Sequence, residues 1–90
     1  MLKEPKRILH IFGQMERGGA ESRTMDIYRN INREIVQFDF IVMKPGEHAF
    51  FQEIKNLGGR IFYIDPPAKR GFLFHAHQMY KVLKDNGPFH

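Results

Sequence analysis

The sequence predicts an α/β fold, a Rossmann-like half-domain whose elements follow one another as β-α-β-α-β-α. Three observations predict it. Short apolar runs alternate with segments whose apolar residues recur at every third or fourth position. Glycine or proline stands at most of the boundaries between these segments. Strands that alternate with helices are typical of right-handed crossovers onto a parallel sheet, so we expect a three-stranded parallel sheet with the strand order 3-2-1.

The first predicted strand covers residues 7–13, and the first predicted helix begins near residue 20. Between residues 8 and 12 only His10 is polar, a pattern typical of a strand buried on both faces. The strand stops at Gly13, where glycine favours a turn. The helix is indicated by a largely apolar stripe at three- and four-residue spacing, which consists of Thr24, Ile27, Tyr28 and Ile31.

A second strand and a second helix follow. Residues 36–43 first alternate between apolar and polar and then become apolar on both faces, which predicts a strand that ends at Pro45-Gly46. The pair Gly58-Gly59 predicts a left-handed C-terminal cap for the next helix. That helix is indicated by apolar residues at helical spacing, which are Phe50, Phe51, Ile54 and Leu57.

The last predicted elements are a strand over residues 60–64 and a helix near the C-terminus. Pro66-Pro67 prevents the strand from continuing. The helix is expected to end near residues 86–88, where the sequence Asn-Gly-Pro is a strong stop signal. Its apolar stripe consists of Leu73, Ala76, Met79 or Tyr80, and Leu83.

The alternating pattern calls for a fourth strand, but no further element follows the last predicted helix. In a doubly wound sheet the first strand is central, so three strands in this order leave residues 7–13 as a bare apolar edge. We therefore expect residues 1–90 to form a partial N-terminal Rossmann-like domain, with no second domain present. We also expect this chain to self-associate through its first-strand edge.

Composition excludes several classes of function for this chain. The 90 residues include no cysteine, which rules out a disulfide framework, a thiolate metal site and a thiol nucleophile. Lys and Arg (14) exceed Asp and Glu (10) to give a net charge of +4, but the basic residues are scattered, so we expect no nucleic-acid partner. No apolar run approaches the roughly 18 residues that span a bilayer, and we expect a cytoplasmic protein.

The segment after the first strand is the strongest candidate for chemistry. Gly18 and Gly19 let the backbone approach a ligand closely, and the N–H groups that begin the following helix attract phosphate or carboxylate. Ligands of open α/β sheets bind beyond the carboxyl ends of the strands, where this loop lies. The spacing does not fit the dinucleotide fingerprint, and Gly19 and Ala20 replace the lysine and hydroxyl residue of the P-loop. The alternative is that the two glycines only form a tight turn.

The histidines and carboxylates predict no metal or catalytic site. On a helix His75 and His77 point about 200° apart and cannot bind one ion together. His10 is expected to be a buried or sheet-end histidine with a backbone partner. The carboxylates fit no metal-ligand spacing, so we expect no metal, no cofactor and no catalytic residue within these 90 residues.

Several segments together resemble the N-terminus of bacterial glycosyltransferases of family 4, closest to the capsular and exopolysaccharide branch. They are residues 7–21 (RILHIFGQMERGGAE), 25–30 (MDIYRN), 37–40 (QFDF) and 57–61 (LGGRI). The resemblance implies a GT-B enzyme in which two Rossmann-like domains face each other across a cleft. It implies retaining stereochemistry, no metal requirement, a nucleotide-diphosphate sugar as donor and a glycan or lipid-linked acceptor in polysaccharide biosynthesis.

Carried onto this chain, the resemblance implies a truncated, acceptor-side GT-B N-terminal domain. Gly18 and Gly19 would approach the donor diphosphate or the transferred sugar. The acceptor would be bordered by Gln14, Met15, Glu16 and Arg17. The family's histidine motif would begin just beyond residue 90, and the donor domain is absent, so we expect this chain alone to be inactive.

Two further interpretations concern partners. The dispersed basic residues suit an acidic acceptor or peripheral contact with the anionic inner face of the membrane. The alternative function is a small stand-alone α/β binding module for a phosphorylated ligand or a protein partner. In that case the bare strand edge would pair with another chain, and the glycine loop would bind the ligand.

Overall fold

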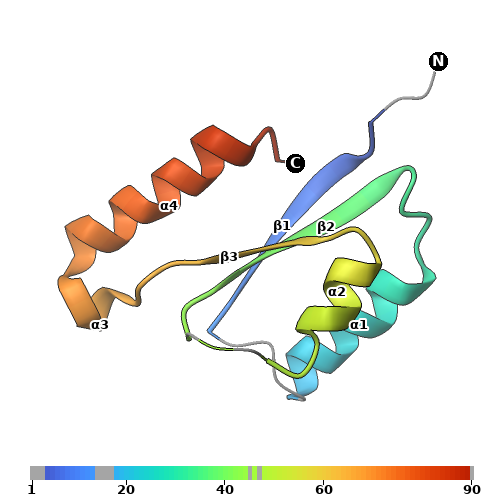
Figure 1. The fold of residues 1–90 in the computed structure, drawn as a ribbon, viewed down its shortest axis with the longest axis horizontal. Coiled ribbons are helices and arrows are strands. Elements are labelled where there is room, and N and C mark those ends of the chain that lie inside the picture. The colour runs from blue at the N-terminus through green and yellow to red at the C-terminus, as the bar shows by residue number, and fades with distance from the viewer. Residues whose placement is uncertain (1–3, 14–17, 45, 47, 90) are drawn as a thin grey trace.

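The computed structural model describes residues 4–13, 18–44, 46 and 48–89. It shows parallel strands that alternate with helices, as predicted (Figure 1). The elements in chain order are β1 (Lys6–Phe12), α1 (Gly19–Asn30), β2 (Val36–Val42), α2 (Phe51–Asn56), β3 (Arg60–Tyr63), α3 (Pro67–Arg70) and α4 (Phe72–Asn86).

The short helix α3 is an element that the sequence pattern does not predict. Pro66 is extended (φ −67°, ψ 156°), and Pro67 is the first helical residue, a position where the missing N–H of proline leaves no hydrogen bond unmade. The proline pair therefore follows the end of β3 and also begins a helix. Gly71 then adopts φ 92°, a left-handed value that glycine tolerates, and separates α3 from α4.

In the three-stranded sheet β2 lies between β1 and β3, and both pairs of strands are parallel. The register places Phe40 of β2 opposite His10 of β1 and Ile61 of β3. Side chains alternate along a strand, so Phe40 belongs to one face of the sheet while Asp39 and Ile41 belong to the other.

The hydrophobic core lies between one face of the sheet and the helices α1 and α2. Figure 1 shows these two helices next to each other on one side of the strands and α4 on the other side. The guanidinium of Arg29 in α1 binds both carboxylate oxygens of Glu53 in α2 and so ties the two helices together. Each fully buried large side chain contributes about 1.5–3 kcal/mol. The buried core residues are Met25, Tyr28, Phe38, Phe40, Val42, Phe50 and Ile54.

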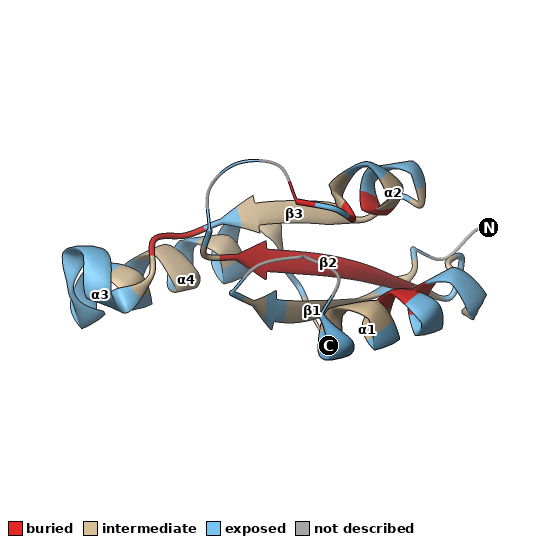
Figure 2. Ribbon diagram, turned by 90° about the horizontal axis from the view of Figure 1, so that it is seen from below, coloured by how far each residue is buried: buried red, intermediate tan, exposed pale blue. Residues whose placement is uncertain are grey.

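The expectation that the first strand is buried on both faces is wrong. No residue of β1 is buried, and Ile11 is 50% exposed, whereas β2 is buried along almost its whole length (Figure 2). The physical reason is position. β1 forms an edge of the sheet, and Ile11 belongs to the face that carries Ile41, opposite the core between the sheet and α1.

The apolar stripe predicted for the last helix forms, but it is not buried. Leu73 is 83% exposed, Tyr80 58% and Leu83 44%. Instead, polar groups attach α4 to the rest of the chain: the side-chain oxygen of Gln78 accepts a hydrogen bond from the backbone N–H of Asp65 at 2.9 Å. No residue of α4 is buried. Within the described ranges, nothing covers this stripe.

Candidate functional site

The carboxyl edge of the sheet is the part of the fold where ligands of α/β proteins bind. The segments that follow β1 and β2 meet there, because the backbone N–H of Met43 donates to the carbonyl oxygen of Gly13 at 3.0 Å. The segment that follows β3 adds Asp65. The edge therefore brings together the ends of all three strands of the sheet.

Gly18 and Gly19 lie at the N-terminus of α1. Gly18 is the N-cap residue, with φ −85° and ψ 173°, and Gly19 is the first helical residue. Gly18 has no side chain that could cap this end, so within the described residues the first-turn N–H groups receive no hydrogen bond from the N-cap residue. A helix start of this kind favours an anionic ligand.

The backbone at Gly18 and Gly19 does not itself require glycine. Neither residue has a positive φ. Among the described residues, a Cβ added at Gly19 would have no atom within 4 Å, and a Cβ added at Gly18 would meet the flexible side chain of Glu21. The alternative that these glycines serve only to form a tight turn involves residues 14–17, which lie outside the described residues, and it stays a prediction. Within the described ranges, the Glu21 side chain is the group that lies beside this helix start.

The carboxylate of Glu21 lies beside the Cβ position of Gly18. A negative charge in the first turn stabilises a helix, because it faces the positive end of the helix dipole. An anionic ligand at this helix start would have to displace that carboxylate. The predicted acceptor-bordering residues Gln14, Met15, Glu16 and Arg17 lie outside the described residues.

Asp65 organises the end of β3, a role that the sequence analysis did not identify. Its carboxylate accepts a hydrogen bond from the hydroxyl of Tyr63 at 2.9 Å and lies 3.4 Å from Lys69 Nζ and 3.6 Å from Arg70 Nε. The Tyr63 hydrogen bond, followed by the two cations, lowers the pKa of Asp65 below its ordinary value. Its position directly after a predicted strand is the sequence signal that indicates such a residue.

The structure gives different surroundings to the three histidines that the sequence analysis discusses. His75 Nδ1 lies 2.9 Å from the carbonyl oxygen of Asp65 and fixes α4 to the end of β3, while His77 is exposed. His10 Nε2 is buried and has no hydrogen-bond partner among the described residues, so the backbone partner expected for it is not found there. Burial lowers the pKa of His10.

Among the described residues, no group of three or more histidine, cysteine or acidic side chains is arranged to hold a metal ion. None of the helices in the described part of the chain combines the length and the apolar character that crossing a membrane requires.

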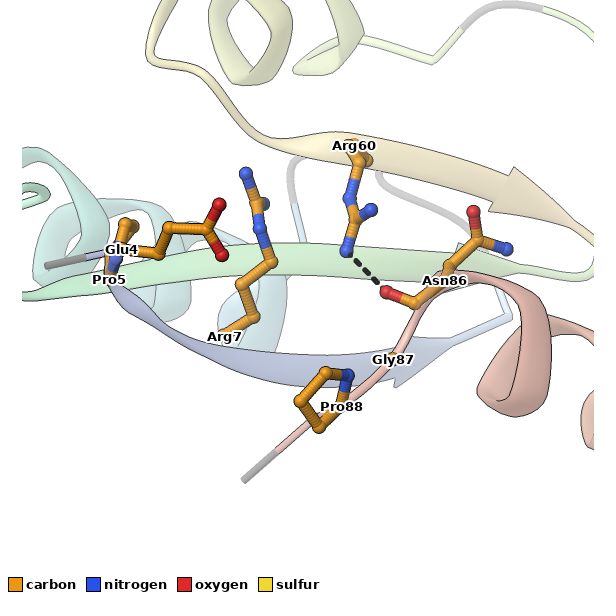
Figure 3. Close-up of a pocket in the computed structure, with 7 residues that line it drawn as sticks. All are labelled: Glu4, Pro5, Arg7, Arg60, Asn86, Gly87 and Pro88. Carbon is orange, nitrogen blue, oxygen red and sulfur yellow. Dashed lines mark hydrogen bonds between the residues drawn. The ribbon is translucent and has the colours of Figure 1, made fainter.

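In the described part of the chain, two of the pockets lie beside the sheet. One, of about 460 Å³, contains Arg7 and Arg60, which lie near the amino ends of their strands (Figure 3). Both arginines already bind the buried carboxylate of Asp39. The other pocket, of about 400 Å³, includes Val42 and Tyr63, the last residues of β2 and β3. Only the second pocket reaches the carboxyl edge where ligands are expected.

Comparison with known proteins relates the chain to bacterial glycosyltransferases. It is 38% identical over 89 residues to the glycosyltransferase EpsF of Bacillus subtilis (strain 168), an alignment that covers 99% of this chain and 23% of EpsF. It is 43% identical over 63 residues to the capsular polysaccharide biosynthesis glycosyltransferase CapH of Staphylococcus aureus, covering 66% of this chain and 16% of CapH. No family model and no solved structure matches the chain.

These comparisons show homology to capsular and exopolysaccharide glycosyltransferases. The homology covers a small N-terminal part of those proteins. The chain spans less than a quarter of the length of either relative.

Proposed function

We propose that this chain is the acceptor-side N-terminal part of a retaining glycosyltransferase with a GT-B fold. The intact enzyme transfers a sugar from a nucleotide-diphosphate sugar to a glycan or lipid-linked acceptor in polysaccharide biosynthesis. Homology over almost the whole chain supports this proposal, as does the parallel α/β sheet with a glycine-rich segment at its carboxyl edge.

The observation that carries the proposal is that the described part of the fold does not require glycine at the start of α1. Gly18 and Gly19 have ordinary backbone angles, and no atom of the described residues lies within 4 Å of the Cβ position of Gly19. Close approach of a ligand explains why glycine stands there, because a side chain would occupy the space beside the first-turn N–H groups. We assign this space to the donor diphosphate or the transferred sugar.

The remaining roles divide between this chain and the rest of the enzyme. Gln14, Met15, Glu16 and Arg17 border the acceptor in this proposal. The groups that bind the nucleotide lie outside these 90 residues. In this proposal the 90-residue chain by itself therefore binds sugar but does not transfer it, and it requires no metal ion.

The test replaces the N-terminal segment of an active exopolysaccharide relative by this chain and measures sugar transfer by the graft and by its Gly19→Ala variant. The added methyl group fits the described part of the fold, because none of its atoms lies within 4 Å of that group. We expect unchanged thermal stability and a fall in kcat/KM of about tenfold, equivalent to about 1.4 kcal/mol of lost transition-state binding. The matched control is Gly13→Ala, where a Cβ also meets no atom within 4 Å but which lies outside the helix start.

Two results would contradict the proposal. Equal activity of the graft and its Gly19→Ala variant would remove the role of the glycines. Sugar transfer by the purified 90-residue chain alone would show that the catalytic groups lie within it.

A further inference from the structure

The pocket at the carboxyl ends of β2 and β3 has walls from three parts of the chain. We call it the lysine pocket. Its volume is about 400 Å³. Strand residues form one wall, the short helix α2 forms another, and Lys44 and Gly46, which follow β2, form the third. The lining residues are Val42, Lys44, Gly46, Phe51, Lys55, Ile61 and Tyr63.

The walls of the lysine pocket are held in place by contacts outside it. The ring of His48 stacks on Phe51 with 4.4 Å between centroids, and His48 Nε2 lies 2.9 Å from the carbonyl oxygen of Lys44. One buried imidazole therefore positions both an aromatic wall and the backbone of a lysine. Tyr63 is fixed on the opposite side, since its hydroxyl donates to Asp65.

The charge of the lysine pocket is not balanced by the described residues. The side-chain ammonium groups of Lys44 and Lys55 make no ion pair or hydrogen bond with the part of the chain that the structure describes. Two other cations near the ends of the sheet do have carboxylate partners. Lys69 lies beside Asp65, and Arg60 binds Asp39. Two ammonium groups thus border an apolar surface without a carboxylate partner among the described residues.

We propose that the lysine pocket binds the anionic group of a sugar in the acceptor. Lys44 and Lys55 pair with the anion, and the apolar ring face of the sugar lies against Phe51 and Tyr63. This is the usual composition of a ligand pocket, in which an apolar lining supplies contact area and a few polar groups fix orientation. The identification of the ligand as acceptor rests on the proposed function, but the binding of a sugar anion does not.

Two sources of the anion share this chemistry: a phosphorylated sugar and the carboxylate of a uronic acid. The test is an NMR titration of the 90-residue chain with glucose 1-phosphate, glucuronate, inorganic phosphate and neutral glucose, at low and at physiological salt. We expect glucose 1-phosphate or glucuronate to shift the backbone amides of the lining residues. Glucose is expected to give much smaller shifts, and salt to weaken binding because the lysines are exposed.

The variants Lys44→Gln and Lys55→Gln identify the groups responsible. Each is expected to weaken binding about twofold to fivefold, the range for one exposed ion pair, and the double variant to weaken it further. The control Lys81→Gln removes an exposed lysine of α4 that is not part of the pocket. Amide shifts outside the pocket verify that each variant keeps the fold.

The titration distinguishes the two sources of the anion. Binding of glucose 1-phosphate alone assigns a phosphorylated sugar, binding of glucuronate alone assigns an acidic sugar, and binding of both assigns recognition of either anion. If neither shifts the lining amides, or if Lys81→Gln weakens binding as much as the pocket variants, the lysine pocket is not an anion site. This titration uses no donor, so its failure leaves the Gly19 transfer experiment unaffected.

Discussion

Arg60 binds the buried carboxylate of Asp39 through both its side chain and its backbone. Its guanidinium lies 2.8 Å from Oδ2 and 3.2 Å from Oδ1, and its backbone N–H donates to Oδ1 at 3.0 Å. Arg7 adds a third strand to the cluster at 2.7 Å. Arg60 also donates to the carbonyl oxygen of Asn86 at the end of α4 (Figure 3). One carboxylate therefore connects all three strands of the sheet and, through Arg60, α4.

Replacement of Asp39 by asparagine tests this cluster. The amide keeps the size of the side chain but removes the charge and presents an NH₂ group to two guanidinium groups. We expect the free energy of unfolding to fall by about 2–3 kcal/mol, less than for a fully buried pair because both arginines are partly hydrated. Urea unfolding at neutral pH measures the change. Glu34→Gln is the control at an exposed carboxylate, and an equal loss in both variants would contradict the prediction.

Gly59 is a position where the fold does require glycine for space. A Cβ there would lie 2.7 Å from Tyr28 Oη and 2.8 Å from both Ile54 Cγ2 and the carbonyl oxygen of Phe38. We expect Gly59→Ala to lower the free energy of unfolding by about 1–3 kcal/mol, the usual cost of overpacking a core. Gly13→Ala is the matched control, since its Cβ meets no atom within 4 Å. Equal unfolding midpoints for the two variants would show that the core relaxes around the methyl group.

Because the apolar stripe of α4 is exposed, we expect alanine substitutions in the core and in the stripe to change the free energy of unfolding by different amounts. Ile54 is fully buried, so Ile54→Ala is expected to cost about 2–5 kcal/mol of unfolding free energy. Leu73 is 83% exposed, so Leu73→Ala is expected to change it by less than about 0.5 kcal/mol. Both values come from chemical denaturation under the same conditions. A large loss for Leu73→Ala would mean that the stripe is covered in solution.

The sequence predicts elements well where the pattern is local. Alternation predicted a strand over residues 36–43, and β2 covers Val36–Val42. The strand predicted over residues 60–64 is β3, Arg60–Tyr63. Local periodicity carries such predictions because each depends on neighbours in the chain.

The unpredicted features depend on distant residues. The Asp39 cluster joins residues from three strands, and only their register brings them together. The exposure of Leu73 depends on what lies over α4, which no spacing pattern reports. At the candidate site the sequence predicts the glycine pair, because a loop after a first strand is a known position for ligands, and the role of this pair stays a prediction. Lys55 gave no such signal, since it reaches the lysine pocket only through the packing of α2.

His10 predicts a pH dependence of stability. Its ring lies among Phe12, Phe38 and Phe40, with centroid distances of 6.3, 4.2 and 5.4 Å, and burial lowers its pKa because the charged form loses hydration. In the unfolded chain the imidazole regains its ordinary pKa, so below that value the unfolded state binds more protons than the folded state. The stability contributed by neutral His10 is therefore complete above the ordinary pKa and falls as the pH drops towards the folded pKa. Urea unfolding from pH 7.5 to 5.0 should give a smaller slope for His10→Phe than for the native chain. The exposed-site control His77→Gln should keep the native slope, and an unchanged slope in His10→Phe would show that His10 is protonated equally in both states.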